Sequence, residues 1–179
     1  MRRRTFDALL TSVGAILTLT LIVAGSLLMW GAVFSQNEVH SQLVSQRIYF
    51  PANHSPEIRA PEFAAMHQYA GQLMTTGAQA EVYADHFIAN HLKAIGLTYS
   101  QASNLARAHP TSTKDAALEQ TVFQGTTLRG LLLEAYGYWV FGQIALVASI
   151  VAFVLAALMA VLSGMGFAHL RRVAPTVQI

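Results

Sequence analysis

Residues 139–167 read WVFGQIALVASIVAFVLAALMAVLSGMGF and contain no Asp, Glu, Lys or Arg. An α-helix rises about 1.5 Å per residue, so about 20 apolar residues cross the hydrocarbon core of a bilayer. This run is longer than that, and the charge-free stretch around it extends from residue 135 to residue 170. The sequence therefore predicts a transmembrane helix, which we place at residues 137–168.

A second run of the same kind lies near the N-terminus. Residues 9–34 read LLTSVGAILTLTLIVAGSLLMWGAVF, within a charge-free stretch from residue 8 to residue 37. The whole chain is 54% hydrophobic and only 11% charged, whereas a soluble domain carries about a quarter charged residues. We predict a first transmembrane helix at residues 8–35. The expected fold class is an all-α membrane protein with two transmembrane helices flanking an extracytoplasmic helical bundle at residues 36–136.

Charges at the two ends predict the orientation. The N-terminal tail (residues 1–7) and the C-terminal tail (169–179) together hold five arginines and one aspartate, while the rest of the chain has six basic and eight acidic residues. Short segments rich in Lys and Arg stay in the cytoplasm. We therefore expect a multi-pass protein of the cell membrane with both termini cytoplasmic. Aromatic residues typical of the opposite membrane interface end the first run and open the second: Trp30, Phe34, Tyr136, Tyr138, Trp139 and Phe141.

The N-terminal run also has features of an export signal. Arg3-Arg4-Thr5-Phe6 resembles a twin-arginine signal, which would be cleaved. The apolar run is about twice the length of a usual signal core, and no clean A-x-A cleavage site follows it. We predict an uncleaved signal anchor.

Small residues recur in both predicted spans at helical intervals. In lipid, close approach of two helix backbones holds spans together, and small side chains permit it. A contact face is therefore expected either within the hairpin or between two copies of the chain, and the sequence does not choose between them. Its predicted members are Ala148, Ala152, Ala156, Ala160 and Gly164 at intervals of four, and Thr11, Thr18 and Gly25 at intervals of seven.

The segment between the spans has helical periodicity. The first helix is expected to continue beyond the membrane to about Arg47, and another to start at Pro61, with Gly77 as an interruption. A third should run from Ala78 to Ile95, with Gly96 as its C-terminal cap.

Two further helices are expected before the second span. Thr98 and Gln101 match a capping box, in which each side chain satisfies a free backbone N–H, so a short helix should start there and end before Pro110. A last helix over residues 113–124 is expected to run on into the second span, with Gly125 and Gly130 as sites for a bend. Together, these predicted helices indicate an α-helical bundle.

Candidate chemistry is concentrated in residues 81–91. The chain has no cysteine, which excludes disulfides and thiolate metal sites. Glu81, Asp85 and His86 are candidate metal ligands, since Glu81 and Asp85 share a helix face. His86 and His91 are five residues apart, whereas zinc-binding helices place histidines four apart on one face. We predict no cofactor and no catalytic residue. A pH response of the extracytoplasmic histidines is an alternative.

Three segments carry a family resemblance: residues 61–92, 98–103 and 127–139. With the basic-flanked spans, they resemble a family of small two-pass membrane proteins from actinobacteria. Some of its members carry the label of aromatic ring-opening dioxygenase. Extradiol ring cleavage needs two histidines and a carboxylate on one open iron site, and the spacing of Glu81, His86 and His91 gives no such shared face. The resemblance therefore implies topology and source, and no catalytic residue.

Three functions fit these features. The first is a non-catalytic, membrane-anchored interaction module or accessory subunit in the cell envelope, with another membrane protein or a second copy as partner. The second is an extracytoplasmic ligand- or metal-sensing domain that acts through a partner. The third is a membrane enzyme. The expected surroundings are the lipid bilayer, and nucleic acid is not expected because basic residues do not cluster on any extracytoplasmic helix.

Overall fold

The computed structural model of the chain describes residues 3–172 and is all-helical, with 84% of the chain in helices. Within this range no β-strand forms; an isolated bridge pairs Tyr49 with Leu73. Two long helices dominate, α1 (Arg3–Gln46) and α5 (Thr113–Leu170), and both are long and apolar enough to cross a membrane. An all-α chain with two such helices was predicted, and this part of the prediction is confirmed. Residues 1–2 and 173–179 of the predicted tails lie outside the described residues.

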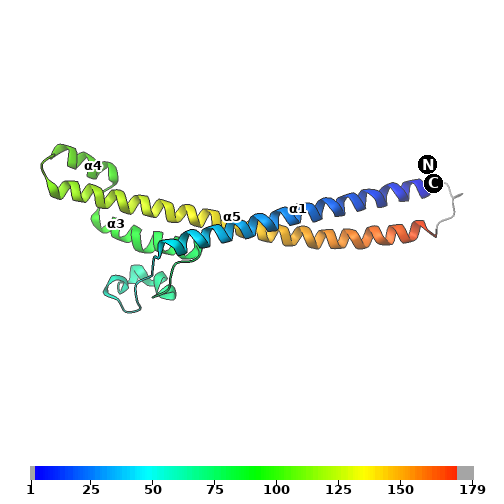
Figure 1. Cartoon of the computed structure of the whole chain (residues 1–179), viewed down its shortest axis with the longest axis horizontal. Coiled ribbons are helices and arrows are strands. Elements are labelled where there is room, and N and C mark those ends of the chain that lie inside the picture. The colour runs from blue at the N-terminus through cyan, green and yellow to red at the C-terminus, as the bar shows by residue number, and fades with distance from the viewer. Residues whose placement is uncertain (1–2, 173–179) are drawn as a thin grey trace. The chain divides into compact units, whose positions relative to one another are not determined.

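The chain divides into two compact units. The first, here called the hairpin unit, contains the chain up to Phe34 and from Gly142 onward. The second, here called the central unit, contains Ser35–Phe141. Figure 1 shows the helices of both units, coloured by residue number.

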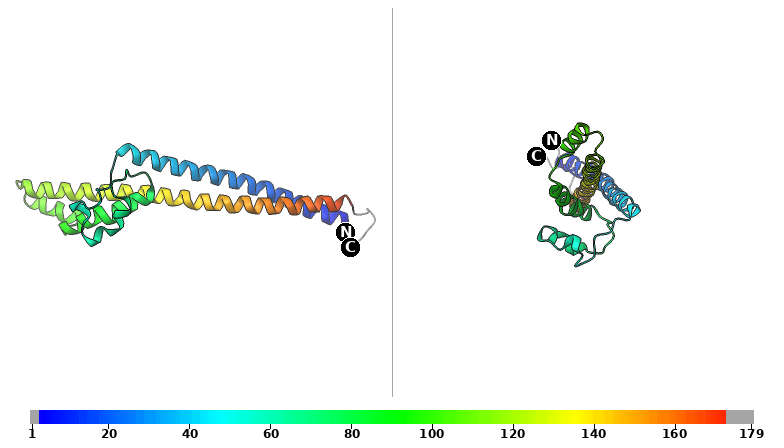
Figure 2. Two further views of the ribbon diagram at one scale, coloured as in Figure 1. Left: turned by 90° about the horizontal axis from the view of Figure 1, so that it is seen from below. Right: turned by 90° about the vertical axis from the view of Figure 1, so that its left-hand side faces the viewer.

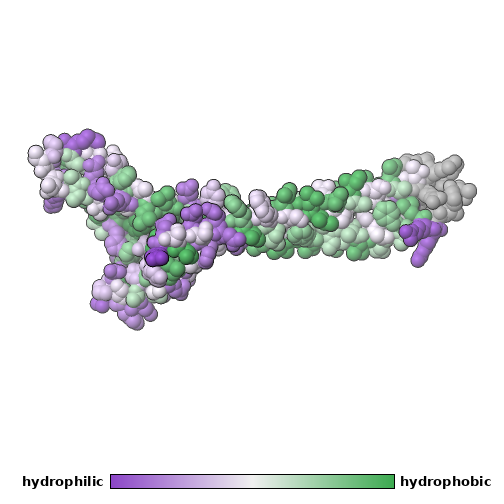
Figure 3. All heavy atoms as spheres, viewed as in Figure 1, coloured by the Kyte–Doolittle hydropathy of each residue, from purple (hydrophilic) through white to green (hydrophobic). Residues whose placement is uncertain are grey.

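In the hairpin unit, the apolar parts of α1 and α5 lie side by side (Figures 1 and 2). Only 17% of the most apolar window of each helix is buried, whereas the core helix of a soluble domain would bury most of its apolar side chains. The outward residues are large and apolar, and the hairpin surface is mostly green in Figure 3. Such a surface suits a hydrocarbon solvent.

The central unit has its own hydrophobic core. The core is drawn from the end of α1, the short helices and α5, and its buried members include Val39, Leu43, Phe50, Met66 and Leu132. Ser35 Oγ donates a hydrogen bond to the carbonyl oxygen of Tyr138 at 2.6 Å, which joins α1 to α5 within this unit. The unit therefore holds together by side-chain packing around two long helices.

Six short helical segments connect α1 to α5. They are η1 (Pro56–Ile58), η2 (Pro61–Tyr69), α2 (Gly77–Val82), η3 (Tyr83–Ile88), α3 (Ala89–Ile95) and α4 (Tyr99–Ala108). Several boundaries agree with the local sequence signals. Gly96 caps α3 in the left-handed conformation at φ 76°, and Thr98 with Gln101 forms the expected capping box. The predicted end of α1 near Arg47 is also confirmed.

Three details differ from the prediction. The helix that starts at Pro61 is a 3₁₀-helix and ends at Tyr69. The chain then turns through Gly71 at φ 72°, and Leu73 pairs with Tyr49, so it leaves the helix well before Gly77. The expected helix over residues 78–95 is present from Gly77, but its middle is a π-helix, η3. Finally, α5 is helical without interruption through Gly125 and Gly130.

Candidate functional site

The segment from Gly77 to Ile95 packs against α5 within the central unit. Two of its contacts are made at glycines, at positions where any side chain would clash. A Cβ on Gly77 would lie 2.2 Å from Trp139 Cβ, and one on Gly125 of α5 would lie 2.8 Å from Leu92 Cδ2. Gly77 and Gly125 therefore let the two elements approach closely at both ends of the segment.

Between these contacts, the π-helix η3 positions Asp85. Ala84 and Ile88 of η3 are buried in the core, and Asp85 Oδ1 accepts a hydrogen bond from Arg129 Nη2 of α5 at 2.6 Å. Both side chains are more than a third exposed, so the pair contributes no more than about 1 kcal/mol. A π-helix adds a residue to the helical turn and recurs at functional sites.

The guanidinium of Arg129 is only partly satisfied. Its Nε is buried and has no hydrogen-bond partner among residues 3–172. A buried donor without a partner costs about 1–3 kcal/mol. Arg129 is therefore held in place by Asp85 through one nitrogen, while its buried Nε has no acceptor among the described residues.

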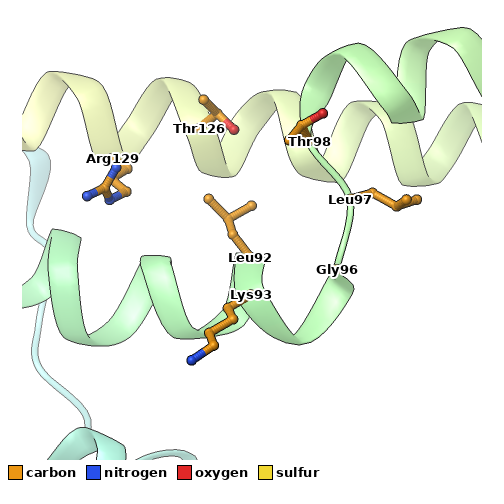
Figure 4. A pocket seen from close by; sticks show the side chains of 7 residues that line it. All are labelled: Leu92, Lys93, Gly96, Leu97, Thr98, Thr126 and Arg129. Atoms are coloured by element: carbon orange, nitrogen blue, oxygen red, sulfur yellow. The ribbon is translucent and has the colours of Figure 1, made fainter.

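A cavity of about 450 Å³ adjoins Arg129, between α3 and α5 (Figure 4). Leu92 points from α3 toward α5, whereas Lys93 points away from α5. The hollow combines apolar walls with a few polar groups, as small-molecule sites commonly do. It is lined by Leu92, Lys93, Gly96, Leu97, Thr98, Thr126 and Arg129.

An aromatic cluster fills the other side of the same segment. Tyr83, Phe87 and His91 follow one another at intervals of four, with ring centroids 4.8 Å apart for Tyr83–Phe87 and 4.4 Å for Phe87–His91. Phe50 packs on Tyr83 and Phe63 packs on His91. Burial raises the pKa of Tyr83 above its usual value, and the nearby Glu57 carboxylate raises it further.

The predicted metal ligands do not come together. Asp85 is engaged by Arg129, and His91 Nδ1 lies 2.7 Å from the carbonyl oxygen of Phe87. Among residues 3–172, no group of three His, Asp or Glu side chains is arranged to hold a metal ion. Glu81 and His86 are both half-buried. The segment is thus a packing and ion-pair element, and its geometry offers no ready ligand set.

In the hairpin unit, small residues of the two helices pack on each other reciprocally. A Cβ on Gly14 would lie 2.5 Å from Ser163 Oγ, and one on Gly166 would lie 2.5 Å from Thr11 Oγ1. Each helix thus sets a glycine against a hydroxyl residue of the other. Farther along, Gly25 packs on the ring of Phe153.

Burial on α5 follows a seven-residue interval. Ser149, Ala156 and Ser163 are buried, and Ala152, between Ser149 and Ala156, is buried as well. Ala148 and Thr18 are half-buried, while Ala160 and Gly164 are exposed. A four-residue interval advances by about 40° per step on a helix of 3.6 residues per turn, so its members cannot all stay on one face. The hairpin uses Thr11, Gly25, Ala152 and Ala156 of the predicted set.

Arg129 was not among the residues singled out from the sequence. It is the only Lys or Arg between Lys114 and Arg171, and an isolated cation on a long helix was a signal for a specific role. Its partner, Asp85, lies 44 residues away, and no local pattern reports a contact over that distance. The π-helix was missed as well, because the apolar spacing of Tyr83–Ile88 does not distinguish a π-helix from an α-helix.

No known protein family, curated protein or solved structure matches the chain. Its function is therefore inferred from its own residues. The resemblance to the actinobacterial family stays a prediction.

Proposed function

We propose that the chain is a two-pass protein of the cell envelope that holds its central unit outside the cytoplasm as a non-catalytic interaction module or accessory subunit. Membrane insertion is supported by the outward apolar side chains of α1 and α5 and by the absence of Asp, Glu, Lys and Arg from residues 8–37 and 135–170. The orientation is supported by the arginines of the two tails. Exposed Trp30, Phe34, Tyr138 and Phe141 suit the opposite interface.

One observation carries the interaction role: large apolar side chains are exposed on the central-unit part of α5, and they are here together called the α5 patch. Phe123, Leu128 and Leu131 are 46%, 37% and 57% exposed, and the ring of Tyr99 packs against Phe123 at a centroid distance of 5.5 Å. These residues lie before the charge-free run of α5, so lipid contact does not account for them. Exposed apolar patches on soluble surfaces mark contact sites. A partner protein would cover this one.

Exposed small residues of the hairpin unit support a partner within the membrane. Ala160 and Gly164 lie on the outward side of α5, where a further helix could approach closely. Either a second copy of the chain or another membrane protein could pack a helix against this surface.

The test is co-purification of the tagged chain from its native membrane in a mild detergent, with mass spectrometry of the bound proteins. We expect a stoichiometric partner, or a second copy of the chain, that is lost in Leu131→Glu. Gln124→Glu places the same charge at another exposed position of α5 and should retain the partner. A chain that elutes alone as a monomer, or a partner equally retained by both variants, would overturn the role of the α5 patch.

A second candidate function is recognition of a small ligand. It is favoured by the cavity beside Arg129, which combines volume, apolar walls and a lining arginine. A domain of this kind would pass its signal through the same partner.

A further inference from the structure

The cavity between α3 and α5 has the composition of a site for an amphiphile. Leu92 and Leu97 supply apolar wall, and Gly96 lets the chain turn at φ 76° between α3 and α4 without a side chain. Thr126 adds a hydroxyl residue on α5, beside Arg129. A ligand with a short aliphatic part and one polar end would match this arrangement of apolar wall and polar groups.

Arg129 determines what the polar end should be. Two cations line the cavity; Lys93 points away from α5 in Figure 4, and Arg129 is the cation that α5 supplies beside Thr126. Asp85 occupies Arg129 Nη2, and the buried Nε has no partner among the described residues. A guanidinium presents its donors as a planar fork that matches a carboxylate.

The charge of the site favours a monoanion. Asp85 already neutralises part of the charge on Arg129 and would repel a dianion such as a phosphate monoester more strongly than a carboxylate. We propose that the cavity lined by Leu92, Leu97, Thr126 and Arg129 binds an aliphatic carboxylate, with the carboxylate on Arg129 and the chain against the two leucines. This site goes beyond the interaction role and does not depend on the α5 patch.

The proposal assigns opposite roles to the two members of the ion pair. Arg129 holds the ligand, whereas Asp85 competes with it. Arg129→Gln and Asp85→Asn both remove the ion pair, so any effect of the ion pair on folding is shared by the two variants. Only a role in ligand binding would give the two variants different affinities.

The test is equilibrium dialysis of radiolabelled hexanoate against the full chain in lipid nanodiscs, with empty nanodiscs as the blank. We expect saturable binding to the wild type, with hexanol and acetate binding about tenfold or more weakly because each lacks one half of the recognition. Arg129→Gln should lose about tenfold or more in affinity, and Asp85→Asn should bind hexanoate at least as tightly as the wild type. Circular dichroism on heating checks that both variants remain folded.

Three results would overturn the proposal. Uptake no greater than that of empty nanodiscs would show that the cavity takes no aliphatic carboxylate. Equal affinity in Arg129→Gln would remove the assigned contact. Equal loss in both variants would show that the ion pair supports the fold and that Arg129 has no separate role in binding. Partner co-purification is measured independently, so failure here leaves the interaction role standing.

Discussion

At the scale of single residues, glycines make the close helix contacts in both units. Gly166 illustrates this in the hairpin unit, where a Cβ would lie 2.5 Å from Thr11 Oγ1. Gly164, two residues earlier on the same helix, has open space where its Cβ would lie, with no other atom within 4 Å beyond its own stretch of helix. Comparing substitutions at Gly166 and Gly164 therefore separates the effect of close packing from the effect of glycine on helix stability.

We predict that Gly166→Ala destabilises the hairpin by about 1–3 kcal/mol, because the added methyl group overlaps Thr11. Gly164→Ala should be neutral or slightly stabilising, since alanine is the better helix former. Unfolding of the full chain in mixed micelles of mild detergent and dodecyl sulfate measures both. Equal effects of the two substitutions would show that the reciprocal contact does not hold the hairpin.

A second glycine makes the corresponding contact in the central unit. We predict that Gly77→Ala lowers the stability of this unit by about 1–3 kcal/mol, because its Cβ would overlap Trp139 and crowd the carbonyl oxygen of Ala135. The indole cannot easily move away, since Trp139 packs against the core. Gly137→Ala, with open space around it on α5, is the control. Thermal unfolding followed by tryptophan fluorescence compares the two, and a neutral Gly77→Ala would contradict the close contact.

Tyr83 makes the stability of the central unit fall at high pH. Burial, and then Glu57, raises its pKa above the usual value of 10.0. The folded state therefore keeps the phenolic proton after the unfolded chain has lost it. The contribution of Tyr83 to stability is fully present below pH 10 and is lost as pH rises through the folded pKa.

We predict that the stability of the wild type falls more steeply above pH 10 than that of Tyr83→Phe, which has no proton to lose. Thermal unfolding in buffers on both sides of pH 10 tests this. Tyr99→Phe, at an exposed position, should keep the wild-type dependence. Identical pH profiles for the wild type and Tyr83→Phe would show that the ring is not buried as described.

At the scale of the element, the same capping motif occurs twice in different surroundings. Thr76 and Gln79 form a capping box on α2, and Thr98 and Gln101 form one on α4. Gln79 is buried, and its Oε1 accepts hydrogen bonds from the backbone N–H groups of Thr75 at 2.7 Å and Thr76 at 3.1 Å. Gln101 is exposed, so water can replace its contacts.

Gln79→Ala is therefore expected to lower stability by about 1–3 kcal/mol, since it leaves the part-buried N–H groups of Thr75 and Thr76 without this acceptor. Gln101→Ala should cost about 1 kcal/mol or less. Chemical denaturation followed by circular dichroism gives both values. A larger loss for Gln101→Ala would contradict the difference in burial between the two motifs.

Local chemistry made several elements predictable from the sequence. The αL cap at Gly96 and the box at Thr98 follow from signals within four residues, and the two long helices follow from apolar length alone. The early end of the helix after Pro61 was not predictable, because the bridge between Tyr49 and Leu73 competes with helix continuation from a distance in the sequence. The α5 residues that pack within the hairpin were not predictable, since small residues lie on several faces of α5 and only the facing helix selects among them.

At the scale of the whole molecule, we propose that a membrane hairpin carries an extracytoplasmic domain. The lack of cysteine in the sequence makes this testable by single substitutions. Ser100, in the central unit, and Thr5, at the start of α1, are both exposed. Neither is part of a contact described above, so Ser100→Cys and Thr5→Cys should leave the fold unchanged.

The most direct test is labelling of these two variants with a membrane-impermeant maleimide in intact and in permeabilised cells. We predict that Ser100→Cys reacts in intact cells, while Thr5→Cys reacts only after permeabilisation. Protection of Ser100→Cys together with labelling of Thr5→Cys in intact cells would reverse the orientation. Labelling of neither in intact cells but of both after permeabilisation would contradict a chain that crosses the cell membrane between them.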